Sequence, residues 1–374
     1  MSTSSTPRLL ATSSGGRAWA LFSSTALACL SLAVFTSASA LSPLPPDCLS
    51  RTVLLEAVAE RDAERVRTEL AGMSKAERKR QATDALMATL AWQKKQYCSP
   101  VSPSPAILRQ LLAAGADPNA AKGEGDRTFL MQAVFERQLE MTSLALDAGA
   151  NPNASNYHES PLLIAIRASD EALVTLLLKR KADPNFRVGG PPEHSTVHSA
   201  LATAGRHPGP SNRVLKALIT GGAVHPKVSS DLQPIDEFAQ FYSGRPEDAN
   251  ETVVLLKKLG ANVNGRPDAD LSTPLTLAVQ SSHTSLAVIE ALLQNGADPN
   301  RYVLYGLTDR RDYENLPLKR RDILEVLFKH GARVEKTPKR GTLDVRSHVR
   351  MNGTADFKET YLRELDAMSA TYPN

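Results

Sequence analysis

The chain has 374 residues, of which 42% are hydrophobic, 22% charged and only 5% aromatic, and its formal net charge is +4. This composition is typical of a folded globular protein and excludes collagen-like, low-complexity and highly charged disordered chains. A charge so close to neutral gives no support to a nucleic-acid partner, whose phosphates usually select a strongly basic face.

The first forty residues differ from the rest of the chain. Arg8 and Arg17 precede the uncharged apolar run "AWALFSSTALACLSLAVF", which small residues and prolines follow. This order is typical of a secretory signal peptide. We therefore expect residues 1–40 to be removed after Ala40 and the mature chain to lie in the periplasm or outside the cell. Two alternatives remain open: an uncleaved membrane anchor, which the Ser and Thr content disfavours, and a lipoprotein site at Cys29.

Cysteine use agrees with export. Beyond the expected signal peptide, the sequence holds Cys48 and Cys98. An even pair in an exported chain predicts one disulfide bond. Because it would close a loop of about 50 residues, this bond would contribute on the order of 4 kcal/mol to stability. The alternative is a pair of buried, unbonded thiols.

One short phrase, seen as "AAGADPN" and again as "QNGADPN", recurs after apolar stretches. Gly in this phrase supplies the left-handed residue that ends a helix, and the Pro and Asn that follow favour a turn. The aligned positions are separated by 34, 32, 41, 38, 36 and 35 residues, and this near-constant period predicts a stack of repeated units. The positions are Gly115, Gly149, Lys181, Gly222, Gly260, Gly296 and Gly331.

A second phrase recurs about ten residues further along each unit. It reads "TFLMQA" at 128–133, "SPLLIA" at 160–165, "STVHSA" at 195–200, "QPIDEF" at 233–238 and "TPLTLA" at 273–278. A Ser or Thr hydroxyl caps the free amides of a helix start, and Pro suits the first turn. Short amphipathic helices separate the two phrases. Each unit is therefore predicted to be a helix, a short turn, a second helix and an outward hairpin.

This arrangement, in a unit of about 33 residues, resembles the ankyrin repeat, whose pattern includes T-P-L-H-x-A. The resemblance covers roughly residues 51–335, and the family's His is expected at His198. It implies an all-α ankyrin-repeat solenoid of about seven to eight helix-turn-helix units with β-hairpin loops. The sequence departs from the pattern where Lys181 replaces Gly, where "QPIDEF" is degenerate, and where the last unit has lost its T-P-L-H-x-A phrase.

The resemblance also divides the chain. A signal peptide at 1–40 is expected to precede an ankyrin repeat domain at 41–335, whose first unit, at 54–72, has the polar character of a capping repeat. Residues 336–374 are expected to be a C-terminal extension. A helix at 354–370 within it would cover the apolar face of the final repeat.

The sequence carries no catalytic motif such as G-x-S-x-G, H-E-x-x-H or a P-loop. We therefore predict a protein that is not an enzyme and uses no cofactor or metal. His194 and His198 have a spacing that can bind a metal on a helix, but the resemblance implies a structural role for His198. The basic tracts at 75–80 and 318–321 are interpreted as solvated surface. The one enzymatic alternative is a cryptic site in the irregular stretch 186–232.

The resemblance implies that partners bind at hairpin tips and at positions just after the T-P-L-H-x-A phrase. Aromatic and Arg side chains at such positions are typical of interface hot spots. The alternative is that the rings fill core left by irregular repeats. The candidates after the phrase are Trp92, Phe135, Glu136, Arg167, Gln240, Phe241 and Gln280, and those at hairpin tips are Tyr157, Arg187, Arg301 and Tyr302.

These observations predict a monomeric, exported protein that binds a partner protein through the concave face of its solenoid. A signal peptide followed by ankyrin repeats is similar to bacterial periplasmic ankyrin proteins, which implies a partner-stabilising or immunity-type role. The alternative is a secreted effector that binds host proteins. The sequence does not identify the partner.

Overall fold

The computed structural model describes residues 52–89, 103–121, 127–156, 158–188, 198–225, 233–265, 272–308, 319–352 and 354–373. The chain divides into two compact units, residues 1–43 and 44–374, and all the described residues belong to the second. Within these residues, no helix has the length and apolarity needed to cross a membrane.

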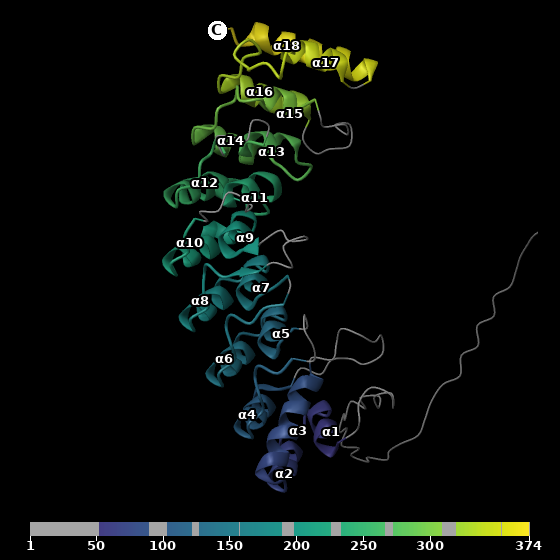
Figure 1. Ribbon diagram of the computed structural model, residues 1–374, viewed down its shortest axis with the longest axis vertical. Helices are drawn as coiled ribbons and strands as arrows, with labels where there is room; N and C mark the ends of the chain where they lie inside the picture. Colours follow the sequence, from purple (N-terminus) through teal and green to yellow (C-terminus); the bar gives the residue numbers. More distant parts are fainter. Residues whose placement is uncertain are drawn as a thin grey trace, which may run out of the picture. The chain divides into compact units, whose positions relative to one another are not determined.

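The described part of the chain contains eighteen α-helices, which alternate between two rows (Figure 1). The first row consists of α1 (Val53–Ala59), α3 (Lys75–Ala88), α5 (Phe129–Phe135), α7 (Pro161–Arg167), α9 (Ala200–Arg206), α11 (Pro234–Phe241), α13 (Pro274–Gln280), α15 (Val303–Gly306) and α17 (Val345–Met351). The second row consists of α2 (Ala63–Ala71), α4 (Pro105–Ala113), α6 (Leu139–Asp147), α8 (Glu171–Lys179), α10 (Arg213–Thr220), α12 (Ala249–Lys258), α14 (Leu286–Gln294), α16 (Arg320–Lys329) and α18 (Ala355–Thr371). Each second-row helix contacts the next one along the row, and the first-row helices from α5 to α17 do the same.

The predicted helix starts are confirmed in three of the five phrases. The hydroxyls of Thr128, Ser160 and Thr273 accept hydrogen bonds from the amide three residues later, at 3.3, 3.3 and 3.1 Å. Gln233, in the degenerate phrase, precedes α11 without a side-chain cap. Pro at the first position of α11 still favours the helix, because its fixed φ suits the first turn.

The predicted helix ends are confirmed at all seven aligned positions. The six Gly residues have φ between +89° and +101°. Lys181 adopts the same left-handed conformation, with φ of +68°. Because this region is sterically costly for a residue with a Cβ atom, Lys181 is held there by the repeat around it.

The Asn of the recurring phrase does more than favour a turn, because its side chain links successive repeats. In Asn264, Nδ2 donates to the carbonyl of Gly296 at 3.0 Å, and Oδ1 accepts from the amide of Asp298 at 2.7 Å. Both contacts cross to the following unit. The same pair of bonds is made by Asn119, Asn153, Asn185 and Asn300.

One junction between repeats uses a different residue. Pro226 stands where five of the other six phrases have this Asn, and its side chain has neither donor nor acceptor. Across the same junction, Asn212 is fully buried and its Nδ2 donates to the carbonyl of Asp248 at 3.2 Å and to Glu251 Oε2 at 3.0 Å. Its Oδ1 accepts from the hydroxyl of Thr252 at 2.7 Å. This buried amide therefore links α10 to the start of α12.

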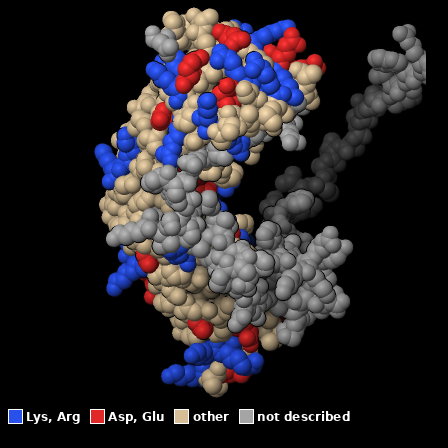
Figure 2. All heavy atoms as spheres, turned by 45° about the horizontal axis from the view of Figure 1, so that its top comes forward, with Lys and Arg blue, Asp and Glu red and all other residues tan. Residues whose placement is uncertain are grey.

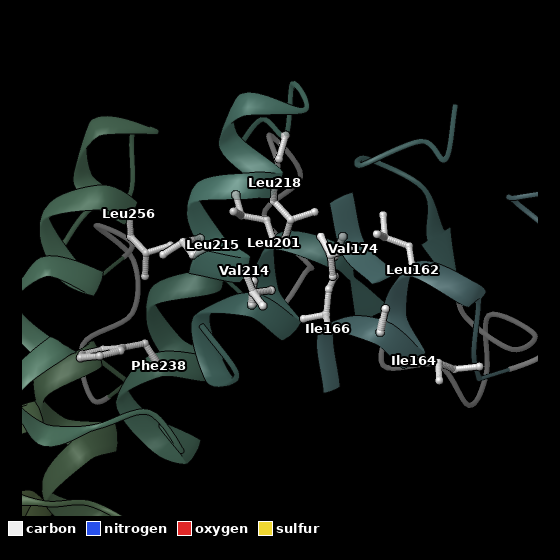
Figure 3. Close-up of a cluster of buried hydrophobic side chains, with 14 of the residues drawn as sticks. Leu162, Ile164, Ile166, Val174, Leu201, Val214, Leu215, Leu218, Phe238 and Leu256 are labelled. Atoms are coloured by element: carbon white, nitrogen blue, oxygen red, sulfur yellow. The ribbon is translucent and has the colours of Figure 1, made fainter. Parts of the chain in front are cut away.

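The apolar core lies between the two rows and runs from repeat to repeat (Figure 3). Ile166 of α7, Val174 of α8, Leu215 of α10, Phe238 of α11 and Leu256 of α12 are completely buried. Burying side chains of this size stabilises the stack by roughly 1.5–3 kcal/mol each. The aliphatic and Ala-rich composition is thus sufficient for a core with few aromatic rings.

The stack continues past the boundary expected at residue 335. The helix predicted at 354–370 is confirmed as α18, but it pairs with α17 and contacts α16, so the two helices extend both rows. Tyr361 of α18 is buried, and its hydroxyl donates to the carbonyl of Leu304 at 2.7 Å. The preceding unit has lost its T-P-L-H-x-A phrase, and there the four-residue helix α15 takes the first-row position. The chain therefore has nine helix pairs among its described residues, and the ninth includes the predicted C-terminal helix.

The predicted β-hairpin loops are represented, in the residues that the structure describes, by one short antiparallel ladder. Strand β1 (Arg187–Val188) pairs with β2 (His198–Ser199), in the register Arg187 to Ser199 and Val188 to His198. The pairing ends at Ser199, where α9 begins.

Candidate partner-binding surface

The C-terminal ends of α5, α7, α9, α11 and α13 lie in a line, because these first-row helices contact one another in that order (Figure 1). The residues at and just after these ends come from five successive repeats. We call them the helix-end surface. It consists of Phe135, Glu136, Arg167, Arg206, His207, Gln240, Phe241 and Gln280.

At the α5–α7 part of this surface, an aromatic ring lies on a network of three charged groups. The Phe135 side chain is 45% exposed, and the guanidinium carbon of Arg127 lies 4.0 Å from its ring centre. Glu159 binds Arg127 at 2.7 Å and Arg167 at 3.3 Å. Since the Arg127 and Glu159 side chains are only 15% and 17% exposed, this network is shielded and holds the exposed ring in place.

A second arginine–aromatic contact joins α9 to α11. The guanidinium carbon of Arg206 lies 4.5 Å from the ring centre of Phe241, whose ring centre is 6.2 Å from that of His283. Among the described residues, no carboxylate lies within ion-pair distance of Arg206. Its exposed guanidinium therefore has no ion-pair partner among these residues.

His207 lies beside this contact in its neutral form. Its Nδ1 is 2.7 Å from the hydroxyl oxygen of Ser243. Burial, together with the positive charges of Arg206 and Arg167, lowers the pKa of His207 to about 4. On the neighbouring helix, burial raises the pKa of Glu237, while Arg206 opposes that change.

Comparison with known families agrees with the fold and with the repeated phrases. A family model for ankyrin repeats in three copies matches residues 97–188, and a model for a single ankyrin repeat matches residues 270–302. The chain contains ankyrin repeats. The matched segments include α4 to α8 and α13 to α14, whose phrases are closest to the family pattern. They exclude the irregular units between them.

Three individual proteins are similar to parts of this chain. An 82-residue segment, 22% of this chain, is 38% identical to the E3 ubiquitin-protein ligase KEG of Arabidopsis thaliana and spans only 5% of that protein. The ankyrin repeat domain of human ASB11 aligns over 64% of this chain and 98% of its own, at 17% identity and a TM-score of 0.49. The ankyrin repeat domain of Bcl-3 aligns over 64% of this chain and 100% of its own, at 20% identity and a TM-score of 0.43.

Several candidates were expected just after the T-P-L-H-x-A phrase of each unit. Those that the structure describes lie together on the helix-end surface. Gln280 is exposed, whereas Gln240 and Phe241 are half-buried. The carbonyl of Gln240 accepts the Ser281 hydroxyl at 2.5 Å. Glu136 accepts hydrogen bonds from the neighbouring Gln132 and Gln138 side chains, both at 2.7 Å.

The hairpin-tip candidates are not gathered in this way. Arg187 is exposed in β1. Tyr302 is half-buried, 6.0 Å from the ring of Tyr305, and the guanidinium of Arg301 donates to the carbonyl of Asn264 at 3.0 Å. Because α15 begins at the next residue, Tyr302 precedes a helix rather than occupying a hairpin tip.

The sequence analysis missed Arg206 because it placed one phrase four residues too early. In the structure α9 begins at Ala200, and the hydroxyl of Ser199 caps it at 3.1 Å. The segment that corresponds to the T-P-L-H-x-A phrase in this unit is therefore "SALATA" and not "STVHSA". His198 consequently lies in β2 and does not occupy the His position of the ankyrin pattern. Arg206, seven residues after the cap, is the equivalent of Phe135 and Arg167.

The spacing in the sequence does not by itself reveal the shift. The distance from the phrase to the next aligned Gly position is 21 residues in the two preceding units and 23 from Ser199, but it is 27 both from Ser195 and from the correctly placed Gln233. Several other candidates lie outside the described residues. They are Trp92, Tyr157, His194, the pair Cys48 and Cys98, Cys29, and the expected signal peptide at 1–40.

Proposed function

We propose that this ankyrin-repeat protein holds one partner protein on its helix-end surface and catalyses no reaction. Ankyrin repeats are in general protein-interaction modules. The observation that carries the proposal is the line of first-row helix ends in which Phe135 is exposed and two rings are stacked with guanidinium groups. Aromatic and Arg side chains of this kind dominate the energetics of protein interfaces.

Phe135 provides a test of the surface. Its exposed fraction, 45%, matches the 47% of Leu139, which begins α6 in the second row. A partner recovered with the purified chain from extract of the source cells should bind the Phe135→Ala variant at least about tenfold more weakly, as expected for an aromatic hot spot. The Leu139→Ala variant should bind normally. Equal affinity for all three proteins would place the interface elsewhere.

We also propose that the protein acts after export. The signal-peptide pattern of residues 1–40 and the Cys48–Cys98 pair support this proposal. Mass spectrometry of the protein isolated from its source should then give a chain starting at Leu41, with both thiols resistant to alkylation until a reductant is added. A chain that retains its first forty residues, or that has two free thiols, would contradict it.

Within an exported role, we favour a monomer that stabilises or blocks a partner in the periplasm, as an immunity protein does. The alternative is a secreted effector that binds host proteins. Cell fractionation distinguishes the two, because a resident partner requires the mature protein to remain in the periplasm. Accumulation in the culture medium would favour the effector.

A further inference from the structure

We propose that the partner segment bound by the helix-end surface is acidic, with an Asp or Glu carboxylate held by Arg206 and Arg167. This inference rests on the proposed function and names the chemistry of the partner. It concerns the α7–α9 part of the surface, where Arg167 and Arg206 are the last residues of two first-row helices that contact each other.

The first argument is charge balance. The only carboxylate that the structure places within ion-pair distance of Arg167 is Glu159, which is shared with Arg127, and none of the described carboxylates pairs with Arg206. Glu237 is buried in α11 and only 7% exposed. Glu136, the other acid nearby, accepts hydrogen bonds from two glutamine side chains. The exposed groups of α7 and α9 therefore present an excess of positive charge.

The second argument is the orientation that stacking imposes on Arg206. The guanidinium carbon of Arg206 lies over the Phe241 ring, 4.5 Å from its centre, and a guanidinium that stacks on a ring leaves its N–H edge free for hydrogen bonds. The structure gives the N–H groups of Arg206 no hydrogen-bond acceptor among the described residues. A planar carboxylate matches this edge with two parallel hydrogen bonds.

The third argument concerns the class of partner. A phosphate backbone would also bind arginines and stack on aromatic rings. However, the chain is close to neutral overall, and Figure 2 shows acidic and basic side chains interspersed over the face in view. A long polyanion would also contact the acidic side chains, whereas a short acidic protein segment would need only the local excess of positive charge on α7 and α9.

The experiment uses the purified chain and a displayed library of random peptides of about twelve residues, a length that can span several repeats. Enriched peptides are synthesised as such and with every Asp and Glu replaced by Asn and Gln, and their affinities are measured by fluorescence anisotropy. We expect the enriched peptides to be acidic. Their amide versions should bind at least about tenfold more weakly, because charge-assisted hydrogen bonds are lost.

A matched pair of variants separates this site from a general charge effect. The double variant Arg167→Gln/Arg206→Gln should lower affinity about tenfold or more. The control, Arg109→Gln/Arg213→Gln, removes the same charge from second-row helices, where both arginines are exposed and paired with Glu140 and Glu171. It should change affinity by less than about twofold, since screened surface charges act weakly at a distance.

Five outcomes would overturn the inference. Equal losses in the two double variants would indicate non-specific attraction, and tighter binding of a single-stranded oligonucleotide would indicate the wrong class of partner. Enrichment of acid-free peptides that Phe135→Ala no longer binds would refute the acidic partner and leave the proposed function intact. Enriched peptides that bind every variant equally, or no enrichment at all, would count against both.

Discussion

Asn212 gives the sharpest test of how the repeats are joined. In the Asn212→Ala variant, three hydrogen bonds to a fully buried amide are lost, those with Asp248, Glu251 and Thr252. At about 1 kcal/mol each, they account for about 3 kcal/mol of the free energy of unfolding. Asn212 also has φ of +55°, a conformation that costs Ala about 1 kcal/mol. The expected loss is therefore about 4 kcal/mol.

Urea titration followed by two probes would measure both the loss and its location. Circular dichroism reports all helices, whereas tryptophan fluorescence reports the N-terminal part of the chain, because Trp92, the one Trp beyond the expected signal peptide, precedes α4. In a solenoid, weakening one junction uncouples the segments on either side. The two transitions should thus coincide in the native protein and separate in the Asn212→Ala variant.

Two further variants serve as controls. Asn212→Gly loses the hydrogen bonds but tolerates the left-handed conformation, so it should be about 1 kcal/mol more stable than Asn212→Ala. Asn352→Ala removes an exposed amide at the end of α17, whose bond to the carbonyl of His348 is local, and should cost less than about 1 kcal/mol. A loss below about 1 kcal/mol for Asn212→Ala, with coincident transitions, would refute the reasoning.

Three other predictions follow from single residues. Lys181→Gly should raise the free energy of unfolding by about 1 kcal/mol, because Lys181 has φ of +68°, and an unchanged urea midpoint would contradict this. Since the pKa of His207 falls to about 4 in the folded protein, the unfolded chain binds more protons between about pH 6.5 and 4, so stability should decrease as the pH is lowered through this window. His207→Gln should flatten that part of the pH profile, and an identical slope in both proteins would exclude His207 as its source. Arg320→Ala should lower the free energy of unfolding by about 3 kcal/mol and detach α18 before the rest of the stack. Arg320 is only 7% exposed, its guanidinium carbon lies 4.7 Å from the ring centres of Phe357 and Tyr361 in α18, and it pairs with Glu364 at 2.6 Å. Hydrogen exchange that does not increase selectively in α18 would contradict this prediction.

Much of the fold could be predicted because its rules act locally. A residue that ends a helix in the left-handed conformation, or a hydroxyl that caps its first turn, works within four residues of itself. For that reason the aligned positions were correct even at Lys181, where the residue type departs from the pattern. The same local rules failed at Ser199, because two serines four residues apart are equally able to cap a helix.

The candidate surface was only partly predictable. The register of the ankyrin phrase brought Phe135 and Arg167 to the helix ends, but the misplaced phrase hid Arg206. The partners of these side chains were also hidden, since the contact between Arg206 and Phe241 joins residues 35 positions apart and depends on how two repeats stack. Periodicity in a sequence shows that repeats stack, but not which side chains meet between them.

The sequence by itself thus determined the repeat, its period and the places where helices begin and end, because local conformational preferences encode them. Only the tertiary structure decided that α17 and α18 extend the stack, that Asn212 joins the junction at which Pro226 replaces the bridging Asn, and that Arg206 has no carboxylate partner among the described residues. These features depend on burial and on hydrogen bonds between units. Such contacts exist only once neighbouring repeats have packed together.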